Sequence, residues 1–567
     1  MSRITPRVSR ATALVVAACA SLLAACSRPV TIASTPSASA GAEITAGELR
    51  RRLYIYADDS MKGRLTGTDG GRRATEWIAR ELTALGLQPA GDSGTFFQEL
   101  PLARRVFDPA SSSLTVGGQR LAPGTDFVAR DAGTAPNAGR GAEVVYGGVW
   151  GDTARMLPGE RAEGKVVLVA VPTATTGQPL WSVPRGPLVV RYRRAAAIAV
   201  INLHALPGET LDSYREPTPS FLNPRFLAQP QPQFFHVTPA TATRMLGAPV
   251  DRAAVGATGA RADVDLRFAT RSAGARNAVA LLPGSDPALR GQYVAIGAHH
   301  DHDGTVSTPV DHDSLRAYNM VVRPRGADSP NRPATEADHA RIRQILDSLR
   351  RIRPRAHMDS VYNGADDDAS GTVTTIEIAE ALARSARKPR RSVLFVFHAA
   401  EEQGLLGAAW FTEHPTVPRD SIVAQLNMDM VGRGAAGDLP GGGPGYMELI
   451  GSRRLSTELG DLVEAVNRET NAGFAFNYEF DANNHPDQYY CRSDHYMYAR
   501  FGIPVTFFST GGHVDYHQLT DEPQYIDYEK MRRVAQLVHD IARRVADLDH
   551  RIVVDKPKPD PRGACRQ

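Results

Sequence analysis

The chain has 567 residues, of which 42% are apolar and 22% are charged. This length exceeds one hydrophobic core and predicts two or three domains, and the composition excludes a disordered or collagen-like protein. The formal charge is +3, and removing Arg3, Arg7 and Arg10 with a predicted signal leaves about zero. Such a balance gives no support for nucleic-acid binding.

The first 26 residues have the pattern of a bacterial lipoprotein signal. A basic start precedes an apolar stretch from Ala11 to Ala25 and then Cys26, and this stretch is too short to span a bilayer. The pattern predicts lipid attachment at Cys26. An ordinary secretory signal is the alternative, and both imply export. Residues 27–44 are rich in Ser, Thr, Ala and Pro, which is typical of a flexible tether.

We therefore expect an exported protein held on a bacterial membrane through a lipid anchor only. The outer membrane is the expected location, with the protein facing the periplasm or the cell surface. Besides two cysteines in the signal, the chain has Cys491 and Cys565, which can pair in an oxidising compartment. Cys565 lies in a Pro- and Lys-containing tail, residues 551–567, which we expect to be disordered. We therefore expect no structural disulfide.

Residues 45–105 are predicted to begin the main domain. A helix is expected from Gly71 to Leu87, because Ala74, Trp77, Ile78, Leu82 and Leu85 have helical spacing and Gly86 provides a stop. Over residues 106–276 the pattern changes to short apolar runs separated by Gly and Pro. This change predicts an inserted, β-rich domain.

Residues 277–550 alternate apolar strands with amphipathic helices, which predicts an α/β fold with a mixed central sheet flanked by helices. The expected strands are 293–298, 393–397, 422–428 and 503–508, and the expected helices include 372–386 and 531–548. An insertion at 303–361 is rich in Pro and Arg. It contains one predicted helix, with Thr335 as N-cap and Ile342, Ile345, Leu346, Leu349 and Ile352 on one face.

Clusters of His, Asp and Glu follow the predicted strands, where open α/β sheets place their ligand sites. They are residues 299–302, 401–402, 427–429 and 515–517, and a further cluster, residues 366–368, precedes a predicted helix. Imidazole and carboxylate without cysteine suit zinc or a similar divalent ion. Singly, each cluster is more often a surface loop, a helix cap or a solvated pair. Five such clusters in order at strand ends indicate a metal site.

These motifs resemble those of the two-zinc aminopeptidases, metallopeptidase family 28, which includes bacterial leucyl aminopeptidase, aminopeptidase Y and glutamate carboxypeptidase. The resemblance begins near Ala46 and includes residues 63–68, Gly-Arg-Leu-Thr-Gly-Thr. It implies the zinc exopeptidase, phosphorylase/hydrolase-like fold and two zinc ions per chain. Residue by residue, it implies that His299 and Asp429 hold one ion, that Glu402 and His517 hold the other, and that Asp367 bridges both.

The resemblance also implies catalytic roles. Glu401 corresponds to the general base that takes a proton from a water between the two ions. Asp301 corresponds to the carboxylate that orients His299. Tyr490 lies where some relatives place a hydroxyl that stabilises the oxyanion, although a core role for Tyr490, with Tyr489 beside it, is an alternative. Four further histidines are expected to be structural: His302, His398, His495 and His513.

The implied function is removal of amino-terminal residues from peptide substrates. A carboxypeptidase or a glutaminyl cyclase is the alternative on this scaffold, and a non-enzymatic receptor-like module is a third. The complete ligand set and Glu401 argue against that third option. The segment 106–276 resembles a protease-associated domain. The insertion at 303–361 is expected either to cap the active site or to pack on the flank or on a second subunit. The sequence predicts no oligomeric state and no side-chain preference.

Overall fold

The computed structural model describes residues 43–131, 136–152, 154–172, 185–222 and 230–567. The predicted signal, Cys26 and nearly all of the predicted tether lie outside these residues. Within the described part, no helix has both the length and the hydropathy needed to cross a bilayer.

The main sheet has four adjacent parallel strands at its centre. In spatial order they are β18 (Ser392–His398), β15 (Tyr293–His299), β19 (Ile422–Met428) and β22 (Val505–Ser509). Antiparallel neighbours flank them, β14 (Ala275–Leu282) beside β18 and β20 (Tyr446–Ile450) beside β22. Short strands complete the edges: β1 (Gln88–Pro89), β2 (Phe97–Leu100) and β21 (Ala475–Asn477). The predicted mixed α/β sheet is confirmed.

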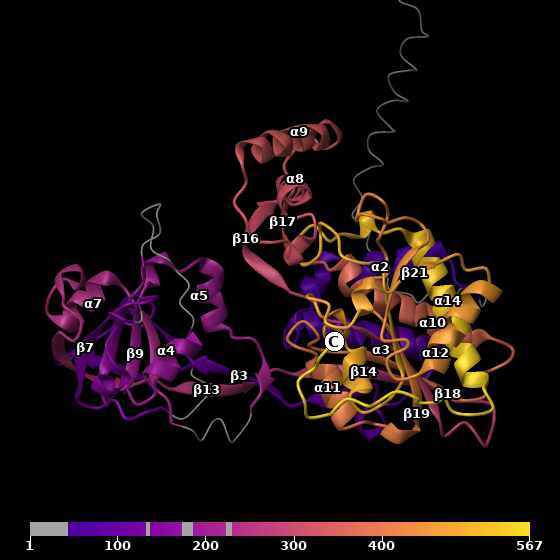
Figure 1. Ribbon diagram of the computed structural model, residues 1–567, viewed down its shortest axis with the longest axis horizontal. Helices are drawn as coiled ribbons and strands as arrows, with labels where there is room; N and C mark the ends of the chain where they lie inside the picture. The colour runs from indigo at the N-terminus through magenta and orange to yellow at the C-terminus, as the bar shows by residue number, and fades with distance from the viewer. Residues whose placement is uncertain (1–42, 132–135, 153, 173–184, 223–229) are drawn as a thin grey trace, which may run out of the picture. The chain divides into compact units, whose positions relative to one another are not determined.

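Helices cover both faces of this sheet (Figure 1). Along β15, Val294 and Ile296 join one hydrophobic core and Ala295 joins the other. The first core also receives side chains from α2 (Ala46–Tyr56), α3 (Asp69–Ala84), α10 (Gly371–Arg384), α12 (Thr457–Glu469) and α14 (Tyr528–Asp547). The second receives Phe411 from α11 (Leu406–Glu413) and Tyr498 from α13 (His495–Ala499). Burial on both faces explains why these strands are continuously apolar.

A second set of strands forms from residues 102–272. The chain enters along β3 (Leu102–Phe107) and leaves along β13 (Phe268–Ser272), which pair antiparallel with Phe107 opposite Phe268. Between them lies an eight-stranded sheet, in order β5-β4-β12-β7-β8-β9-β11-β6. In that order, the strands are β5 (Gln119–Arg120), β4 (Ser113–Val116), β12 (Thr258–Asp265), β7 (Ala142–Val149), β8 (Val166–Ala170), β9 (Ala197–Ile201), β11 (Gln233–Val237) and β6 (Phe127–Arg130). Helices α4 (Arg185–Arg191), α5 (Gly208–Arg215) and α7 (Pro239–Leu246) accompany it. The likeness to a protease-associated domain stays a prediction.

The insertion at 303–361 is a hairpin that carries two helices. Strands β16 (Thr305–Asp311) and β17 (Met358–Val361) pair at its base, and α8 (His312–Val322) and α9 (Glu336–Ile352) lie between them. Thr335 caps α9 as predicted, since its side chain accepts from the Asp338 N–H. However, no residue of α9 is buried, and Ile352 is 79% exposed. The apolar face of α9 is therefore only partly covered within the described part of this chain: Ile342, Ile345, Leu346 and Leu349 are half-buried, and Ile352 is exposed.

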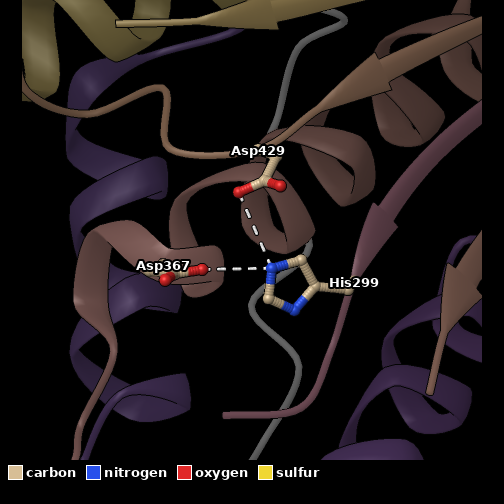
Figure 2. A group of neighbouring side chains, drawn as sticks. All are labelled: His299, Asp367 and Asp429. Carbon is tan, nitrogen blue, oxygen red and sulfur yellow. Dashed lines mark hydrogen bonds and ion pairs between the residues drawn. The ribbon is translucent and has the colours of Figure 1, made fainter. Parts of the chain in front are cut away.

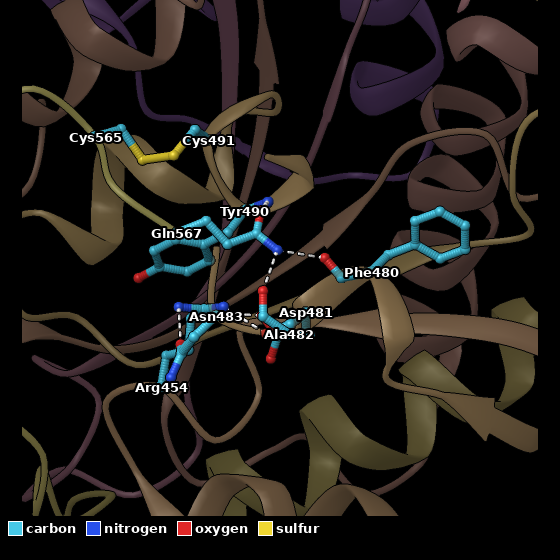
Figure 3. Close-up of a disulfide and its surroundings, with 9 residues drawn as sticks. All are labelled: Arg454, Phe480, Asp481, Ala482, Asn483, Tyr490, Cys491, Cys565 and Gln567. Atoms are coloured by element: carbon cyan, nitrogen blue, oxygen red, sulfur yellow. Dashed lines mark hydrogen bonds and ion pairs between the residues drawn. A yellow bond between two sulfur atoms is a disulfide. The ribbon is translucent and has the colours of Figure 1, made fainter. Parts of the chain in front are cut away.

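The expectations of a disordered tail and of no structural disulfide are wrong. Cys491 and Cys565 form a disulfide with an S–S distance of 1.99 Å (Figure 3). Residues 551–567 contain no helix or strand, but Ile552 belongs to the main core. The side-chain amide of Gln567 donates to the carbonyls of Phe480 (2.6 Å) and Ala482 (3.0 Å). The Pro and Lys content therefore indicated a lack of regular structure, not a lack of contacts.

Candidate metal centre

The predicted ligands gather at the carboxyl ends of the parallel strands. His299 ends β15, Glu402 follows β18, Asp429 follows β19 and His517 follows β22. Asp367 lies in the turn that precedes α10. Because the four strands are adjacent and parallel, their carboxyl ends meet at one edge of the sheet. The fold thus brings together residues that are far apart in sequence.

The first ligand group consists of His299, Asp367 and Asp429 (Figure 2). His299 Nε2 lies 3.1 Å from Asp367 Oδ1 and 3.6 Å from Asp429 Oδ1. One ligand atom from each residue lies within 4.8 Å of the other two, and all three residues are buried. This spacing and this mixture of imidazole and carboxylate fit a divalent ion.

The second group forms on the other oxygen of Asp367. His517 Nε2 lies 3.0 Å from Asp367 Oδ2 and 3.1 Å from Glu402 Oε2. The two oxygens of Asp367 thus face two different histidines, as a carboxylate that bridges two ions must do. All five predicted ligands lie in these two groups.

The electrostatics of the cluster fit two cations. Asp367, Glu401, Glu402 and Asp429 form no ion pair with Lys or Arg in the described residues. Three of them face histidines instead: Asp367 faces His299 and His517, Glu402 faces His302 and His517, and Asp429 faces His299. Burial raises the pKa of Glu401 well above its ordinary value, and the charges of Asp429 and Glu402 add to this effect. Burial also raises the pKa of Asp429. Divalent ions would neutralise this concentration of buried carboxylates.

Glu401 differs from its neighbour Glu402 in position. Glu402 belongs to groups that can hold an ion, whereas Glu401 belongs to none among the described residues. Glu401 instead lines a pocket together with Asp367, Asp429 and His517. Its backbone N–H donates to Asp301 Oδ1 at 3.1 Å, and the same Asp301 oxygen lies 3.7 Å from His299 Nδ1. Asp301 therefore contacts both the base candidate and a ligand candidate.

The insertion contributes one wall of this pocket. Asp328, in the turn Gly326–Asp328, lines the pocket and accepts from Arg492 through both carboxylate oxygens, at 2.9 and 3.1 Å. Arg492 also donates to the Tyr516 hydroxyl at 3.1 Å, and the Ala327 N–H donates to the Tyr516 carbonyl at 3.0 Å. The segment between α8 and α9, but not α9 itself, therefore lies beside the metal centre.

The role predicted for Tyr490 does not agree with the structure. Tyr490 is 3% exposed and packs in the second core, with the Arg454 guanidinium 4.4 Å from its ring centre (Figure 3). Its neighbour Tyr489 lines the pocket, as does Tyr516. The two adjacent tyrosines point to different surroundings from one short 3₁₀ helix, Tyr489–Cys491. The sequence left this choice open, and Tyr490 takes the core position.

Three further histidines that were expected to be structural are fully buried. His398, His495 and His513 belong to no possible ligand group in the described part of the chain. His302 is different, because its Nδ1 lies 2.6 Å from Glu402 Oε1 and it can join Asp367 and Glu402 around an ion. The expectation that His302 is merely structural therefore needs correction: it contacts a predicted ligand directly.

Two residues that the sequence analysis missed support the ligands. Asp303 Oδ2 lies 3.3 Å from His517 Nδ1, the ring nitrogen that faces away from Asp367 and Glu402. Ser493 donates to Asp429 Oδ2 at 2.7 Å. Asp303 was detectable as the last carboxylate of the run that begins at His299. Ser493 carries no comparable signal, because an isolated serine has no metal-binding pattern.

Part of the chain is similar to known proteins. Residues 350–542 match Peptidase family M28, a range that contains Asp367, Glu401, Glu402, Asp429 and His517 but not His299. The chain is 35% identical over 136 residues to leucine aminopeptidase 1 of Metarhizium robertsii, covering 21% of this chain and 34% of that protein. It is 28% identical over 153 residues to leupeptin-inactivating enzyme 1 of Streptomyces exfoliatus, covering 26% and 30%. The chain thus spans about a third of the length of these curated relatives.

Among solved structures, the aminopeptidase from Aneurinibacillus sp. strain AM-1 is similar, with a TM-score of 0.46 and 18% sequence identity. The alignment covers 91% of this chain and 97% of that one.

Asp303→Asn is expected to weaken binding of the ion at His517 and Glu402. The carboxylate that orients His517 would be lost, and such outer contacts are worth about 10- to 100-fold in metal affinity. Metal content and chelator competition on the purified protein measure both sites. Asp347→Asn, on the exposed helix α9, is the matched control. Equal affinities in wild type and Asp303→Asn would contradict this role.

Proposed function

We propose that this chain, which contains a Peptidase family M28 domain, is a zinc-dependent exopeptidase that removes amino-terminal residues from peptides. The observation that carries the proposal is the position of Asp367 between His299 and His517, with the unligated Glu401 beside them. The leucine aminopeptidase among the relatives agrees with this reaction. The share of each relative that is matched leaves the activity of the whole protein a proposal.

Zinc suits the donor set, since every ligand is an imidazole or a carboxylate and no cysteine takes part. His299 and Asp429 would hold one ion, Glu402 and His517 the other, and Asp367 both. When bound, the two ions supply Lewis acidity to a water molecule and to the scissile carbonyl. The groups of this chain do the remaining work.

Glu401 accepts a proton from the attacking water and returns it to the leaving amine, a role worth about 10² to 10⁴ in rate. Asp301 holds the Glu401 backbone through the Glu401 N–H and lies beside His299. Because the buried Asp301 carboxylate contacts both residues, it fixes the position of the base, Glu401, relative to the ligand His299. Tyr489, Phe507 and Met430 line the same pocket and offer apolar surface to the side chain at the cleaved position.

The wall formed by Asp328 supports exopeptidase rather than endopeptidase action. A substrate whose chain ends in the pocket needs no exit on that side, where Asp328 and Arg492 line the pocket and form a bidentate ion pair. A carboxypeptidase or a glutaminyl cyclase would use the same ligands, and a substrate panel distinguishes them.

Export and lipid attachment at Cys26 are part of the proposal. The Cys491–Cys565 disulfide supports them, because such bonds persist in oxidising compartments. Under this proposal the peptidase domain acts outside the cytoplasm.

Glu401→Gln is expected to lower kcat by at least about 10²-fold while metal content stays near that of the wild type. Asp367→Asn is expected to lose metal as well as activity, because both oxygens of Asp367 face histidines. Hydrolysis of amino-acyl arylamides, N-blocked peptides and C-terminal substrates, with metal analysis of each variant, measures both effects. Full turnover by Glu401→Gln would exclude Glu401 as the base, and cleavage of only C-terminal or cyclisable substrates would exclude the aminopeptidase.

Replacing residues 311–355 with a short Gly/Ser linker is expected to raise kcat/KM for longer peptides relative to dipeptides by about tenfold, the scale of one altered pocket contact. The reason is the loss of Asp328 from the pocket wall. Asp328→Ala tests the same contact with the insertion intact, and Ile352→Ser on exposed α9 is the control. A ratio that stays constant in both pocket variants would show that the insertion does not restrict substrates.

Cys26→Ser, expressed with the native signal, is expected to be absent from the membrane fraction and to keep its peptidase activity. A single lipid anchor on a flexible tether is separable from catalysis. Membrane fractionation and activity assays measure the two properties. If the variant still fractionates with membranes, another contact holds it there.

A further inference from the structure

The insertion contacts the loop that carries His517 through one face of helix α8. Arg316 and Asn319 are three residues apart on α8, so their side chains project from the same face of the helix. Arg316 donates to the Asp515 carboxylate. The side-chain amide of Asn319 donates to Gln518 Oε1 at 3.2 Å. Helix α8 therefore contacts the loop both before and after His517.

Burial makes the ion pair between Arg316 and Asp515 stronger than a surface pair. The Asp515 side chain is fully buried, and the Arg316 side chain is 14% exposed. Little water screens charges in such surroundings, so their attraction is larger than it would be in solvent. The Arg316 guanidinium also lies 3.6 Å from the centre of the Tyr525 ring, a cation–π contact that fixes its position. The insertion thus restrains Asp515 through Arg316.

The turn that follows α8 packs on Tyr516, the residue directly before His517. The Ala327 N–H donates to the Tyr516 carbonyl at 3.0 Å. A Cβ atom at Gly326 would lie 2.4 Å from the same carbonyl oxygen, so only glycine permits this close approach. Together with α8, this turn restrains the backbone on both sides of His517.

His517 depends on such restraint because of its own backbone conformation. Its φ is +52°, in the left-handed region that is uncommon for residues other than glycine. A conformation of this kind persists only where the surrounding contacts fix it. His517 Nε2 lies 3.0 Å from Asp367 Oδ2 and 3.1 Å from Glu402 Oε2. A change in the backbone of the loop would move the imidazole away from both carboxylates.

We propose that the insertion is a structural part of the second metal site, formed by Glu402 and His517, and that Arg316 is a positioning residue for His517. This role rests on the proposed metal centre and extends it, because the insertion then supports metal binding as well as forming a pocket wall. Arg316 belongs to no ligand group and does not line the pocket, so it acts through Asp515. The coupling is reciprocal, and an ion at the second site stabilises the contact with α8.

Zinc titration of the metal-free full chain by calorimetry tests this role. Arg316→Met is expected to weaken zinc binding at the second site about tenfold, the lower end of the effect of contacts outside the ligands, and to leave the first site unchanged. His517→Ala identifies the binding event that belongs to the second site. Arg343→Met, the same substitution on the exposed face of α9, is the matched control.

The Arg316 variant is expected to fold. Arg433 Nη1 lies 3.0 Å from Asp515 Oδ2, so the buried carboxylate keeps a counterion when Arg316 is replaced. Arg316→Lys retains the positive charge and is expected to recover part of the zinc affinity. Asn319→Ala removes the second contact of α8 and provides an independent variant with the ion pair intact.

Hydrogen exchange provides a readout that does not depend on activity. Zinc is expected to slow amide exchange in α8 of the wild type, because an ion bound only by the folded loop stabilises its contacts. The slowing is expected to be smaller in Arg316→Met and unchanged in Arg343→Met. A merely structural effect of the substitution would lower the melting temperature without a difference between the two sites.

Four outcomes would overturn the inference. Equal affinity of the second site in the wild type, Arg316→Met and Asn319→Ala is the first. Equal weakening of both sites is the second, and exchange in α8 that zinc leaves unchanged is the third. Each of these leaves the proposed metal centre standing. The fourth is binding of fewer than two zinc ions by the wild type, which would contradict the metal centre itself.

Discussion

The position of Asp367 between two histidines is the constraint on which the metal centre depends. Its Oδ1 faces His299, at the end of β15, and its Oδ2 faces His517, in the loop after β22. A carboxylate side chain is short, so both oxygens reach their partners only if the turn before α10 is held within a fraction of an ångström. Much of the surrounding structure can be understood as a support for that turn.

Backbone contacts from several directions provide this support. Asp521 accepts two consecutive N–H groups of the turn, those of Asp366 and Asp367. On its other side the buried Arg64 guanidinium donates to the carbonyls of Asn363 (2.6 Å) and Gly364 (2.9 Å). These charge-assisted bonds are stronger than neutral ones and are buried. The motif at residues 63–68, noted from the sequence, therefore acts through Arg64 on the turn of the bridging ligand.

The sequence predicted best where one physical cause dominates. Strands buried on both faces are continuously apolar, and a metal centre without cysteine draws its ligands mainly from His, Asp and Glu. The pattern therefore predicted β15, β18, β19 and the clusters that contain the five ligand candidates. It predicted poorly where the outcome depends on direction or on long-range contacts. Tyr489 and Tyr490 are adjacent residues of the same type, so the sequence does not distinguish them. Only packing decides which one reaches the pocket. Asp303 and His517 are in contact but lie 214 residues apart in the sequence. Gln567 and Tyr490 are likewise in contact across more than 70 residues. No local sequence pattern encodes such contacts.

The disulfide between Cys491 and Cys565 spans a sequence separation of 74 residues. Arg492, Ser493, Phe507 and His517 all lie inside this covalent loop, and they include a ligand candidate and part of the pocket wall. A closed loop has fewer conformations than an open chain, so the unfolded state of this segment is less favourable by about 3–5 kcal/mol at these lengths. One side of the metal centre thus keeps its parts near one another even in molecules that have lost their tertiary structure.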